Sequence, residues 1–542
     1  MGQMKTPGVY IVEKNAFPNS IVEVATAVPA FIGYTQFAQN GKKSLHNTPM
    51  RITSMAEFHK FFGFAATSQF SLAEAEKDPK GVQFQGKDKR YQLQQDAGKF
   101  QLYRAMMLFY QNGGGPCYVV SVGSYLGDDG KENAVAPDKL TAGVDTLLKE
   151  QEPTMVLVPD AILLGEADCI SVQQAVLAHC GGKMRNRVAI LDIYDGYKDR
   201  QDESGDCIEN FRSKLGINYL DFASAYYPWV NTTIVLDRDL SFENISSLAI
   251  LQEVIRQERG IADAEVAIAD DAPAAKKAEL LKLNQQIKLV NGLSTDWSTV
   301  KADPVDGESE DENKARTKSK VEAEKLQLHK ALKALSPAYV EVLAHIRQQL
   351  NLLPPAAAMA GIYTMVDNSL GVWKAPANVS LSAVVSPAVN ISHDEQEDLN
   401  VTTSGKSINA IRTYIGEGTL VWGARTLDGN SLDWRYINVR RTMIMLEESI
   451  RLATKAYVFE NNTANTWATI KSMIRNFLTG IWKRGGLAGA SPEDAFSVSV
   501  GLGETMTGED ILEGILRVTV LVALIRPAEF IEITFQQQMQ KS

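Results

Sequence analysis

The chain has 542 residues and a formal net charge of −10, from 55 Lys and Arg against 65 Asp and Glu. Hydrophobic residues make up 45% and charged residues 22%, which is ordinary for a globular protein of several domains. This composition excludes a wholly disordered chain, a collagen-like fibre and a disulfide-built scaffold, and the acidic balance argues against a nucleic-acid coat. No apolar run approaches the roughly 20 residues that span a bilayer. The first ten residues hold no apolar signal core, so we expect neither membrane insertion nor Sec export.

Residues 1–30 predict an extended arm. Two short β-rich runs, at 9–12 and 21–24, are too short to be buried without a sheet elsewhere. Pro7-Gly8 before the first run is a turn signal.

Residues 31–240 predict a mixed α/β domain. Near-continuous apolar runs at 31–34, 117–122, 154–159 and 187–192 are typical of strands covered on both faces. Helices are expected at 101–110, which ends at the glycines 113–115, and at 171–179 as a crossover. The alternation of strands and helices gives the fold class α/β.

Residues 241–350 predict a charged helical insertion. Fourteen of the 25 residues at 301–325 are charged, so apolar residues are too sparse there for a core. We expect an exposed and partly flexible segment whose charges face solvent.

Residues 351–542 predict a compact C-terminal part. Apolar residues at spacings of three and four predict amphipathic helices at 439–453 and 467–481. Residues 496–500, 515–524 and 529–535 predict strands, with 518–525 buried. The last strand is close to the chain end and could be a free arm.

The sequence shows no motif for catalysis, cofactor binding or metal binding. Gly405-Lys406-Ser407 resembles the end of a phosphate-binding loop, but Asn400 stands where that loop needs its first glycine. The acidic run 393–398 lacks the glycine and spacing of a calcium loop and predicts a solvated loop. Four cysteines without a C-x-x-C pair predict free thiols. A cytoplasmic α/β enzyme remains an alternative, which would show a concave pocket with convergent polar residues.

A series of short motifs occurs along the chain. They are Thr6-Pro7-Gly8-Val9-Tyr10, Asn112-Gly113-Gly114 before Cys117-Tyr118-Val119-Val120, Tyr226-Tyr227-Pro228-Trp229, Gly371-Val372-Trp373-Lys374-Ala375-Pro376 and Pro527-Ala528-Glu529-Phe530. In this order they resemble the contractile tail sheath family, which clads the tubes of contractile phage tails, tailocins and extracellular contractile injection systems. The resemblance covers roughly residues 1–35, 100–235 and 350–542. The rest, 36–99 and 241–349, would be variable outward-facing decoration.

The resemblance implies a multi-domain sheath fold, with a discontinuous core domain made from the N- and C-terminal parts and inserted outer domains. It implies boundaries at 1–30 for a linker arm, 31–240 for an α/β sheath domain, 241–350 for the insertion and 351–542 for the C-terminal core. The implied function is structural, without catalysis or cofactor: a subunit that polymerises around an inner tube and contracts from a metastable extended state, driving the tube through a target envelope. A non-contracting paralogue at the baseplate or cap end is the alternative.

The implied partners are further copies of the chain in stacked six-fold rings, an inner tube protein, and baseplate and tail-terminator or cap proteins. No nucleic acid is expected. The protein would be made in the bacterial cytoplasm and become part of a phage tail or a tail-like particle.

The resemblance also implies which residues make these contacts. The inter-subunit strands would contain Val9, Tyr10, Ile11 and Val12 at one end and Phe530, Ile531, Ile533 and Phe535 at the other. The alternative is that both strands complete the sheet of their own subunit. The candidates for contact with the inner tube are Lys471, Arg475, Lys483 and Arg484, which could instead simply solvate and cap their helix.

Overall fold

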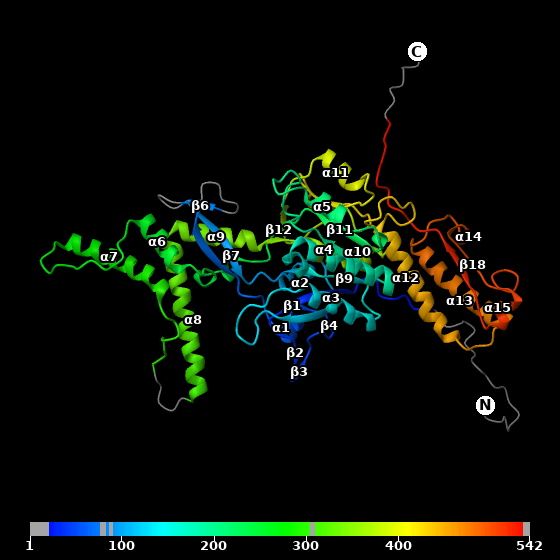
Figure 1. Ribbon diagram of the computed structural model, residues 1–542, viewed down its shortest axis with the longest axis horizontal. Helices are drawn as coiled ribbons and strands as arrows, with labels where there is room; N and C mark the ends of the chain where they lie inside the picture. The colour runs from blue at the N-terminus through cyan, green and yellow to red at the C-terminus, as the bar shows by residue number, and fades with distance from the viewer. Residues whose placement is uncertain (1–20, 76–82, 86–89, 304–308, 535–542) are drawn as a thin grey trace, which may run out of the picture.

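A nine-stranded mixed sheet forms the centre of the molecule (Figure 1). The computed structural model describes residues 21–75, 83–85, 90–303 and 309–534. The strands run in the order β14 (Val379–Ser380), β17 (Gly418–Trp422), β16 (Asn409–Tyr414), β11 (Ala223–Tyr227), β10 (Val188–Asp192), β9 (Met155–Leu157), β1 (Pro29–Thr35), β8 (Cys117–Ser124) and β4 (Met50–Ile52). Neighbours from β16 to β8 are parallel, whereas β4 pairs antiparallel with β8, β17 with β16, and β14 with β17.

The central strands are buried on both faces, as the apolar runs predict. Every residue of β1 and of β10 is buried. The ring of Phe31 lies 5.1 Å from that of Phe109 on one face, and the next residue, Ile32, faces Gly143 on the other. The four predicted strands of residues 31–192 are therefore confirmed, and the fold is mixed α/β.

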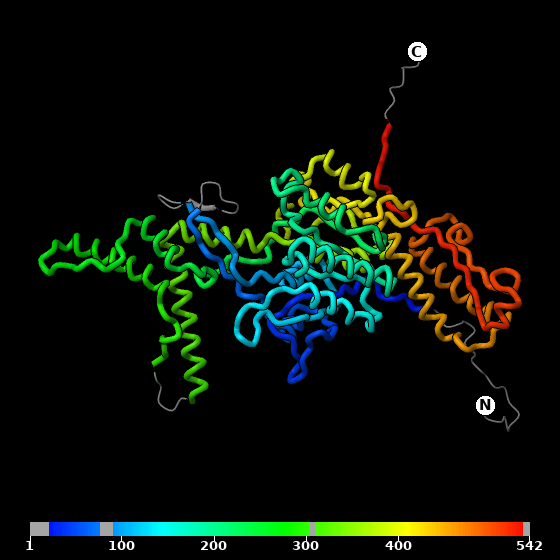
Figure 2. The backbone as a smooth tube through the Cα atoms, viewed as in Figure 1, coloured from blue at the N-terminus to red at the C-terminus, as the bar shows by residue number. Residues whose placement is uncertain are grey.

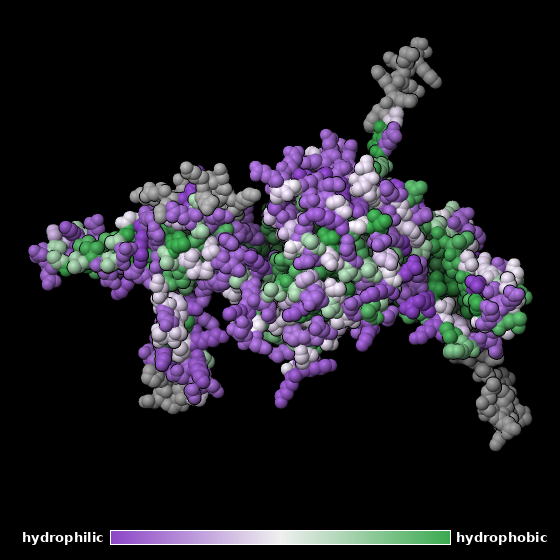
Figure 3. Space-filling view, in the orientation of Figure 1, coloured by the Kyte–Doolittle hydropathy of each residue, from purple (hydrophilic) through white to green (hydrophobic). Residues whose placement is uncertain are grey.

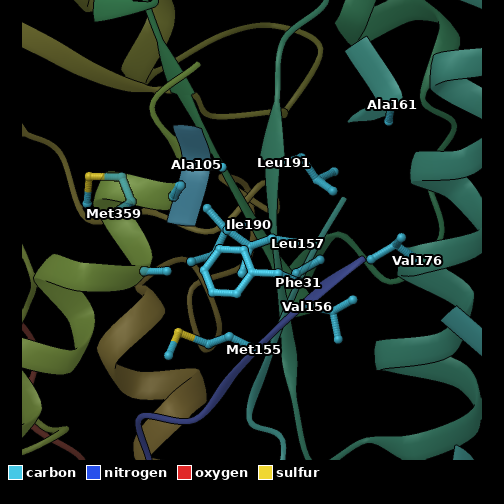
Figure 4. Close-up of a cluster of buried hydrophobic side chains, with 14 of the residues drawn as sticks. Phe31, Ala105, Met155, Val156, Leu157, Ala161, Val176, Ile190, Leu191 and Met359 are labelled. Carbon is cyan, nitrogen blue, oxygen red and sulfur yellow. The ribbon is translucent and has the colours of Figure 1, made fainter. Parts of the chain in front are cut away.

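Helices cover both faces of this sheet. Helices α2 (Leu102–Gln111) and α10 (Ala356–Leu370) pack together on one face, and α3 (Pro137–Thr146) and α4 (Glu166–Leu177) on the other. Figure 4 shows Ala105 and Met359 on one side of the strands and Val176 on the opposite side. The helix predicted at 101–110 is confirmed, and the chain reverses after it at Gly113, whose φ of 92° suits glycine.

A second hydrophobic cluster lies at one end of the molecule (Figure 1). It combines β5 (Gln69–Glu74) and β7 (Arg90–Ala97) with the helices α6 (Leu248–Arg259), α7 (Ala274–Asn291), α8 (Glu310–Leu335) and α9 (Pro337–Leu350). The long helices expected in 241–350 are thus present. The buried part of α8 begins only at Leu328, and its preceding turns project into solvent, in agreement with their charge.

A third cluster lies at the opposite end. It is built on α12 (Ile437–Thr454) and α13 (Ala464–Lys483), which confirm the two predicted amphipathic helices, and on β18 (Phe496–Ser499) and β19 (Thr519–Val522). Smaller elements complete the described chain: β2 (Gln39–Asn40), β3 (Lys43–Ser44), α1 (Met55–Phe62), β6 (Gln83–Gln85), α5 (Cys207–Lys214), β12 (Val230–Thr232), β13 (Leu352–Leu353), β15 (Val384–Pro387), α11 (His393–Asn400), α14 (Pro492–Ala495) and α15 (Gly508–Leu512).

Three local predictions are wrong. The acidic run 393–398 is helical, because the Ser392 hydroxyl accepts the amide of Glu395 while the Glu395 carboxylate accepts the amide of Ser392. Residues 21–24 form no strand, since they lie along helices rather than beside a sheet. The strand predicted as buried at 518–525 is the shorter β19, which is half-exposed.

A buried carboxyl joins the sheet to α10. Asp192 ends β10, and its Oδ1 accepts the backbone amide of Ala356 at 2.9 Å, at the first residue of α10. A carboxylate at a helix N-terminus is favoured by the free amides there. Burial nevertheless dominates and raises the pKa of Asp192 to about 7.

We therefore expect Asp192→Asn to change how stability depends on pH. Because the folded-state pKa lies above that of the unfolded chain, the wild-type contribution is full at acid pH and is lost as pH rises through about 7. The asparagine keeps an accepting oxygen and no charge. Relative to wild type it should gain on the order of 4 kcal/mol of unfolding free energy between pH 4 and pH 9. Urea unfolding at both pH values measures this, with exposed Asp128→Asn as the control; parallel curves for Asp192→Asn and wild type would contradict it.

Candidate assembly interface

The last described residues of the chain leave the body of the molecule (Figure 2). Within residues 529–534 the predicted strand is absent, and no backbone hydrogen bond joins this segment to any part of the described chain. Phe530, Ile531 and Ile533 are 75%, 80% and 70% exposed. Three large apolar side chains therefore extend into solvent on a strand-like sequence without a strand partner. Phe535 lies outside the described residues.

Glu529 holds the root of this C-terminal arm, which we define as residues 530–534. Its carboxylate accepts two hydrogen bonds from Arg425, with Nε at 3.0 Å and Nη2 at 2.6 Å. Asn400 Nδ2 donates at 2.7 Å and the Tyr436 hydroxyl at 2.9 Å. Burial by itself raises the pKa of Glu529, but the bonds from Arg425 and Asn400 outweigh it, and the pKa lies below its ordinary value. Glu529 is thus a fixed carboxylate at the base of an exposed segment.

The first described residues run along the C-terminal helices. Ile21 is buried in the third cluster, and the amide of Val24 donates to Ser449 Oγ on α12 at 3.1 Å. The carbonyl of Thr26 accepts from Arg441 at 3.0 Å and from Thr154 Oγ1 at 2.7 Å. The chain is therefore tied to α12 before it enters β1. The predicted strand residues Val9, Tyr10, Ile11 and Val12 lie outside the described residues.

Arg441 is itself held in a buried ion pair. Its guanidinium makes two bonds to Asp367 on α10, at 2.9 and 2.5 Å, and both side chains are almost inaccessible, at 4% and 2%. Bidentate pairing of this kind fixes the guanidinium plane. The same side chain therefore joins α10, α12 and the N-terminal segment.

Strands β18 and β19 form a separate two-stranded antiparallel sheet. One face packs on α13 through Phe496 and Val498, whereas Leu521 on β19 is 64% exposed. In the described part of the chain no third strand pairs with either edge. Figure 3 shows hydrophobic residues reaching the surface at this end of the molecule. A two-stranded sheet with open edges is a site at which extended chains add.

The outer edge of β19 can be assigned from its hydrogen bonds. The amide of Ala523 donates to Ala495 on the β18 side at 2.8 Å. Because successive residues of a strand point their amides in opposite directions, the amides of Val520 and Val522 face the open edge.

The four cations proposed to contact a tube lie on or just after α13. Three of them face acidic residues of the same chain: Lys471 with Glu504 at 3.6 Å, Arg475 with Glu493 at 3.9 Å, and Arg484 with Glu23. Lys483 is exposed. These pairs are solvent-accessible, and such pairs contribute about 0–1 kcal/mol each. The surface is therefore of mixed charge, and its cations can exchange partners at little cost.

Sites of other kinds have little support in the described residues. Across 21–75, 83–85, 90–303 and 309–534, no group of three His, Cys, Asp or Glu is placed to hold a metal ion. No helix in these ranges has the length and apolarity to cross a bilayer. Lys406 of the incomplete phosphate loop is buried, and its ammonium donates to the carbonyl of Arg212. The four cysteines are buried free thiols, as predicted, and burial raises each pKa to about 12.

One cavity of about 300 Å³ lies between the N-terminal segment and α12. Its lining combines apolar residues, among them Val188 and Met445, with polar and charged ones, among them Glu152, Glu448 and Arg451.

Comparison with known proteins matches residues 430–538 to the family described as the phage tail sheath C-terminal domain. The tail sheath protein of Enterobacteria phage T4 is 25% identical over 135 residues, which are 25% of this chain and 20% of that protein. That of Vibrio phage KVP40 is 28% identical over 138 residues, again 25% and 20%. The match thus spans about a fifth of the length of these curated relatives.

Solved structures match nearly the whole chain. The sheath complex of the extracellular contractile injection system PVC, in its contracted state, is 25% identical with a TM-score of 0.54, covering 99% of both chains. The contracted helical sheath of the anti-feeding prophage is 24% identical with a TM-score of 0.56, covering 99% of this chain and 100% of the other. The chain therefore has the fold of the contractile sheath proteins, and its residues 430–538 match the family of the phage tail sheath C-terminal domain.

Proposed function

We propose that the chain is a structural subunit of a contractile sheath, which polymerises around an inner tube and drives it through a target envelope by contracting. The observation that carries this proposal is the C-terminal arm, residues 530–534. It presents Phe530, Ile531 and Ile533 to solvent and pairs with no strand in the described part of its own subunit. An exposed apolar strand is a liability in a monomer and a connector in an assembly.

The sheet of β18 and β19 is the proposed acceptor of such arms. Two strands alone form a marginal sheet, and added strands would pair its open edges by main-chain hydrogen bonds. Its two edges can take two chains, which suits one C-terminal and one N-terminal arm from different neighbours. Because donor and acceptor surfaces differ, the contact is heterologous and repeats into a helical filament.

Contraction is then a change between two packings of the same subunits. Added strands would keep neighbours connected while each subunit rotates as a rigid body. The partners remain those that the sequence suggests: further copies, a tube protein, and baseplate and cap proteins. Lys471, Arg475, Lys483 and Arg484 stay candidates for the tube contact, made by exchanging their present acidic partners for those of the tube.

A second candidate is a specialised ring at the baseplate end. The contracted baseplate of the anti-feeding prophage also matches the fold, with a TM-score of 0.60 at 22% identity. Copy number in purified particles separates the two functions. Hundreds of copies per particle indicate the main sheath, and about one ring of copies indicates the specialised role.

Blocking the outer edge of β19 should prevent assembly. Val520→Pro removes the one amide that faces the open edge at this position and leaves the bonds between β18 and β19 in place. We expect a folded subunit that forms no striated tubes in negative-stain electron microscopy. Val520→Thr keeps the amide and a β-branched side chain and should assemble as wild type. Normal tubes from a folded Val520→Pro subunit would contradict the acceptor role.

Lengthening the linker after the N-terminal run tests the strand connections in contraction. An insertion of a few residues between Asn15 and Ser20, outside the described residues, should allow extended sheaths to assemble. It should also uncouple neighbours, because a slack connection no longer transmits the rotation of one ring to the next. Electron microscopy of triggered particles measures the contracted fraction. Contraction at the wild-type level would refute the connected-strand mechanism.

A further inference from the structure

We propose that Glu529 is a positioning residue that anchors the C-terminal arm to the nine-stranded sheet and so carries the pull of a neighbouring subunit into the body of the protein. This inference rests on the proposed function, since it assumes that the arm is donated. It goes beyond that function by naming the place where the subunit resists the pull.

Three residues surround the Glu529 carboxylate, and we define these residues, Arg425, Asn400 and Tyr436, as the socket. Both oxygens of the Glu529 carboxylate are used, by Arg425, Asn400 and Tyr436, which come from three different segments of the chain. The Arg425 side chain is 3% exposed, and its Nη1 also donates to the carbonyl of Asn400 at 3.0 Å. A charged, bidentate bond in a dry site is stronger than a neutral one. The socket therefore holds one carboxylate in one position.

The socket connects directly to the centre of the sheet. The amide of Arg425 donates to Asn409 Oδ1 on β16 at 2.8 Å, and Asn409 Nδ2 donates back to the Arg425 carbonyl at 2.8 Å. The same Nδ2 reaches the carbonyl of Ala225 on β11 at 3.2 Å. Strands β11 and β16 are parallel neighbours buried between helices. A pull on Glu529 thus reaches the nine-stranded sheet through two side chains, Arg425 and Asn409.

Without this anchor the pull would fall on a weaker element. Going back along the chain from Glu529, the next contacts are an exposed ion pair between Arg526 and Asp433, at 3.6 Å, and a single bond from Asn438 Nδ2 to the carbonyl of Ile525, at 3.1 Å. Behind them, Ala523 bonds to Ala488 and Ala495, and β19 pairs, among the described strands, with the four-residue strand β18. A strand at the edge of a two-stranded sheet opens easily. If β19 opened, the proposed acceptor site would be lost together with the donated arm.

Sequence position supports the same assignment. Glu529 lies between Ala528 and Phe530, and its hydrogen bonds are the last that the described part of the chain makes to its own body. Glu532, three residues further along, is exposed in the arm. Glu532 is thus a glutamate close to Glu529 in sequence that lies outside the socket, and it provides a control of the same residue type.

The test compares Glu529→Gln with Glu532→Gln in full-length protein, assembled with its tube and baseplate partners. Hydrogen exchange in the isolated subunit should be faster at the amides of Arg425 and Thr426, which donate to Asn409 Oδ1 and the Arg435 carbonyl, for Glu529→Gln only. The increase should be about ten- to a hundredfold, as expected when a hydrogen bond between charged groups is lost. Contracted sheaths of this variant should break into short segments, whereas Glu532→Gln should give continuous sheaths. Glu529→Asp, which keeps the charge, should restore part of the continuity.

A general loss of stability must be separated from loss of the anchor. Val421→Ala opens a cavity in the buried strand β17 without touching the arm, and it should leave sheaths continuous. If Glu529→Gln does not fold, Tyr436→Phe removes one bond and keeps the ion pair. It should then give a smaller increase in exchange at the amides of Arg425 and Thr426, and unchanged exchange would overturn the proposal.

The outcome also distinguishes this inference from the function beneath it. A chain truncated after Glu529 keeps the anchor and lacks the arm. If that chain assembles and contracts normally, the donated arm is wrong. If it fails while Glu529→Gln gives continuous sheaths, the arm stands and the anchor is overturned.

Discussion

The pairing of backbone groups is the constraint on which this structure depends. An extended chain can leave water only when its amides and carbonyls find partners. The central sheet meets this condition within the subunit. The parallel strands β11, β10, β9, β1 and β8 lie side by side in this order, each paired with its neighbours, and helices cover both faces of the sheet. The β18–β19 sheet and the C-terminal arm do not meet it within the described chain. The two unsatisfied elements are complementary to each other, which is the physical basis for proposing that copies of the chain join.

Near its two ends, at Thr26 and Glu529, the described chain is held by side-chain hydrogen bonds rather than by pairing within a sheet. Thr26 at one end and Glu529 at the other each bind a buried arginine, Arg441 and Arg425. Buried ion pairs add little net stability compared with apolar contacts of the same size. Their value here is geometric, since a bidentate pair fixes direction as well as distance. Both Thr26 and Glu529 are therefore held at defined points of the body.

Local patterns predicted the elements whose cause is local. The apolar runs of β1, β8, β9 and β10 and the stripes of α12 and α13 need only their own residues to be recognised. Helix α11 was missed although Ser392 and Glu395 form a capping box, because the acidic composition suggested a loop. The packing of β5 and β7 against the helices α6 to α9 and the segment before them has no local signal at all: Phe70 and Ile245 meet across the sequence in one core.

Some residues of the candidate interface can be recognised from the sequence, and others only from the folded chain. The exposed apolar run at Phe530, Ile531 and Ile533 is visible in the sequence, whereas the role of Glu529 is not. A single glutamate after Pro527-Ala528 looks like any surface acid, and only the folded chain places Arg425 opposite it. The one sequence signal for a special role of Glu529 is its position between apolar residues at the start of a predicted strand. Predictions for Val9, Tyr10, Ile11, Val12 and Phe535 concern residues outside the described chain.

The distribution of ion pairs suggests how one subunit could serve two lattices. The accessible pairs Lys471–Glu504 and Arg475–Glu493 contribute about 0–1 kcal/mol each, so a neighbour or a tube can replace them at little cost. Breaking a buried pair such as Arg441–Asp367 leaves an uncompensated charge, which costs about 3–5 kcal/mol. A transition that repacks subunits should therefore change the first kind of contact and preserve the second. Under the proposed function, contraction exchanges surface partners while the sheet, α12 and both anchors move as one body.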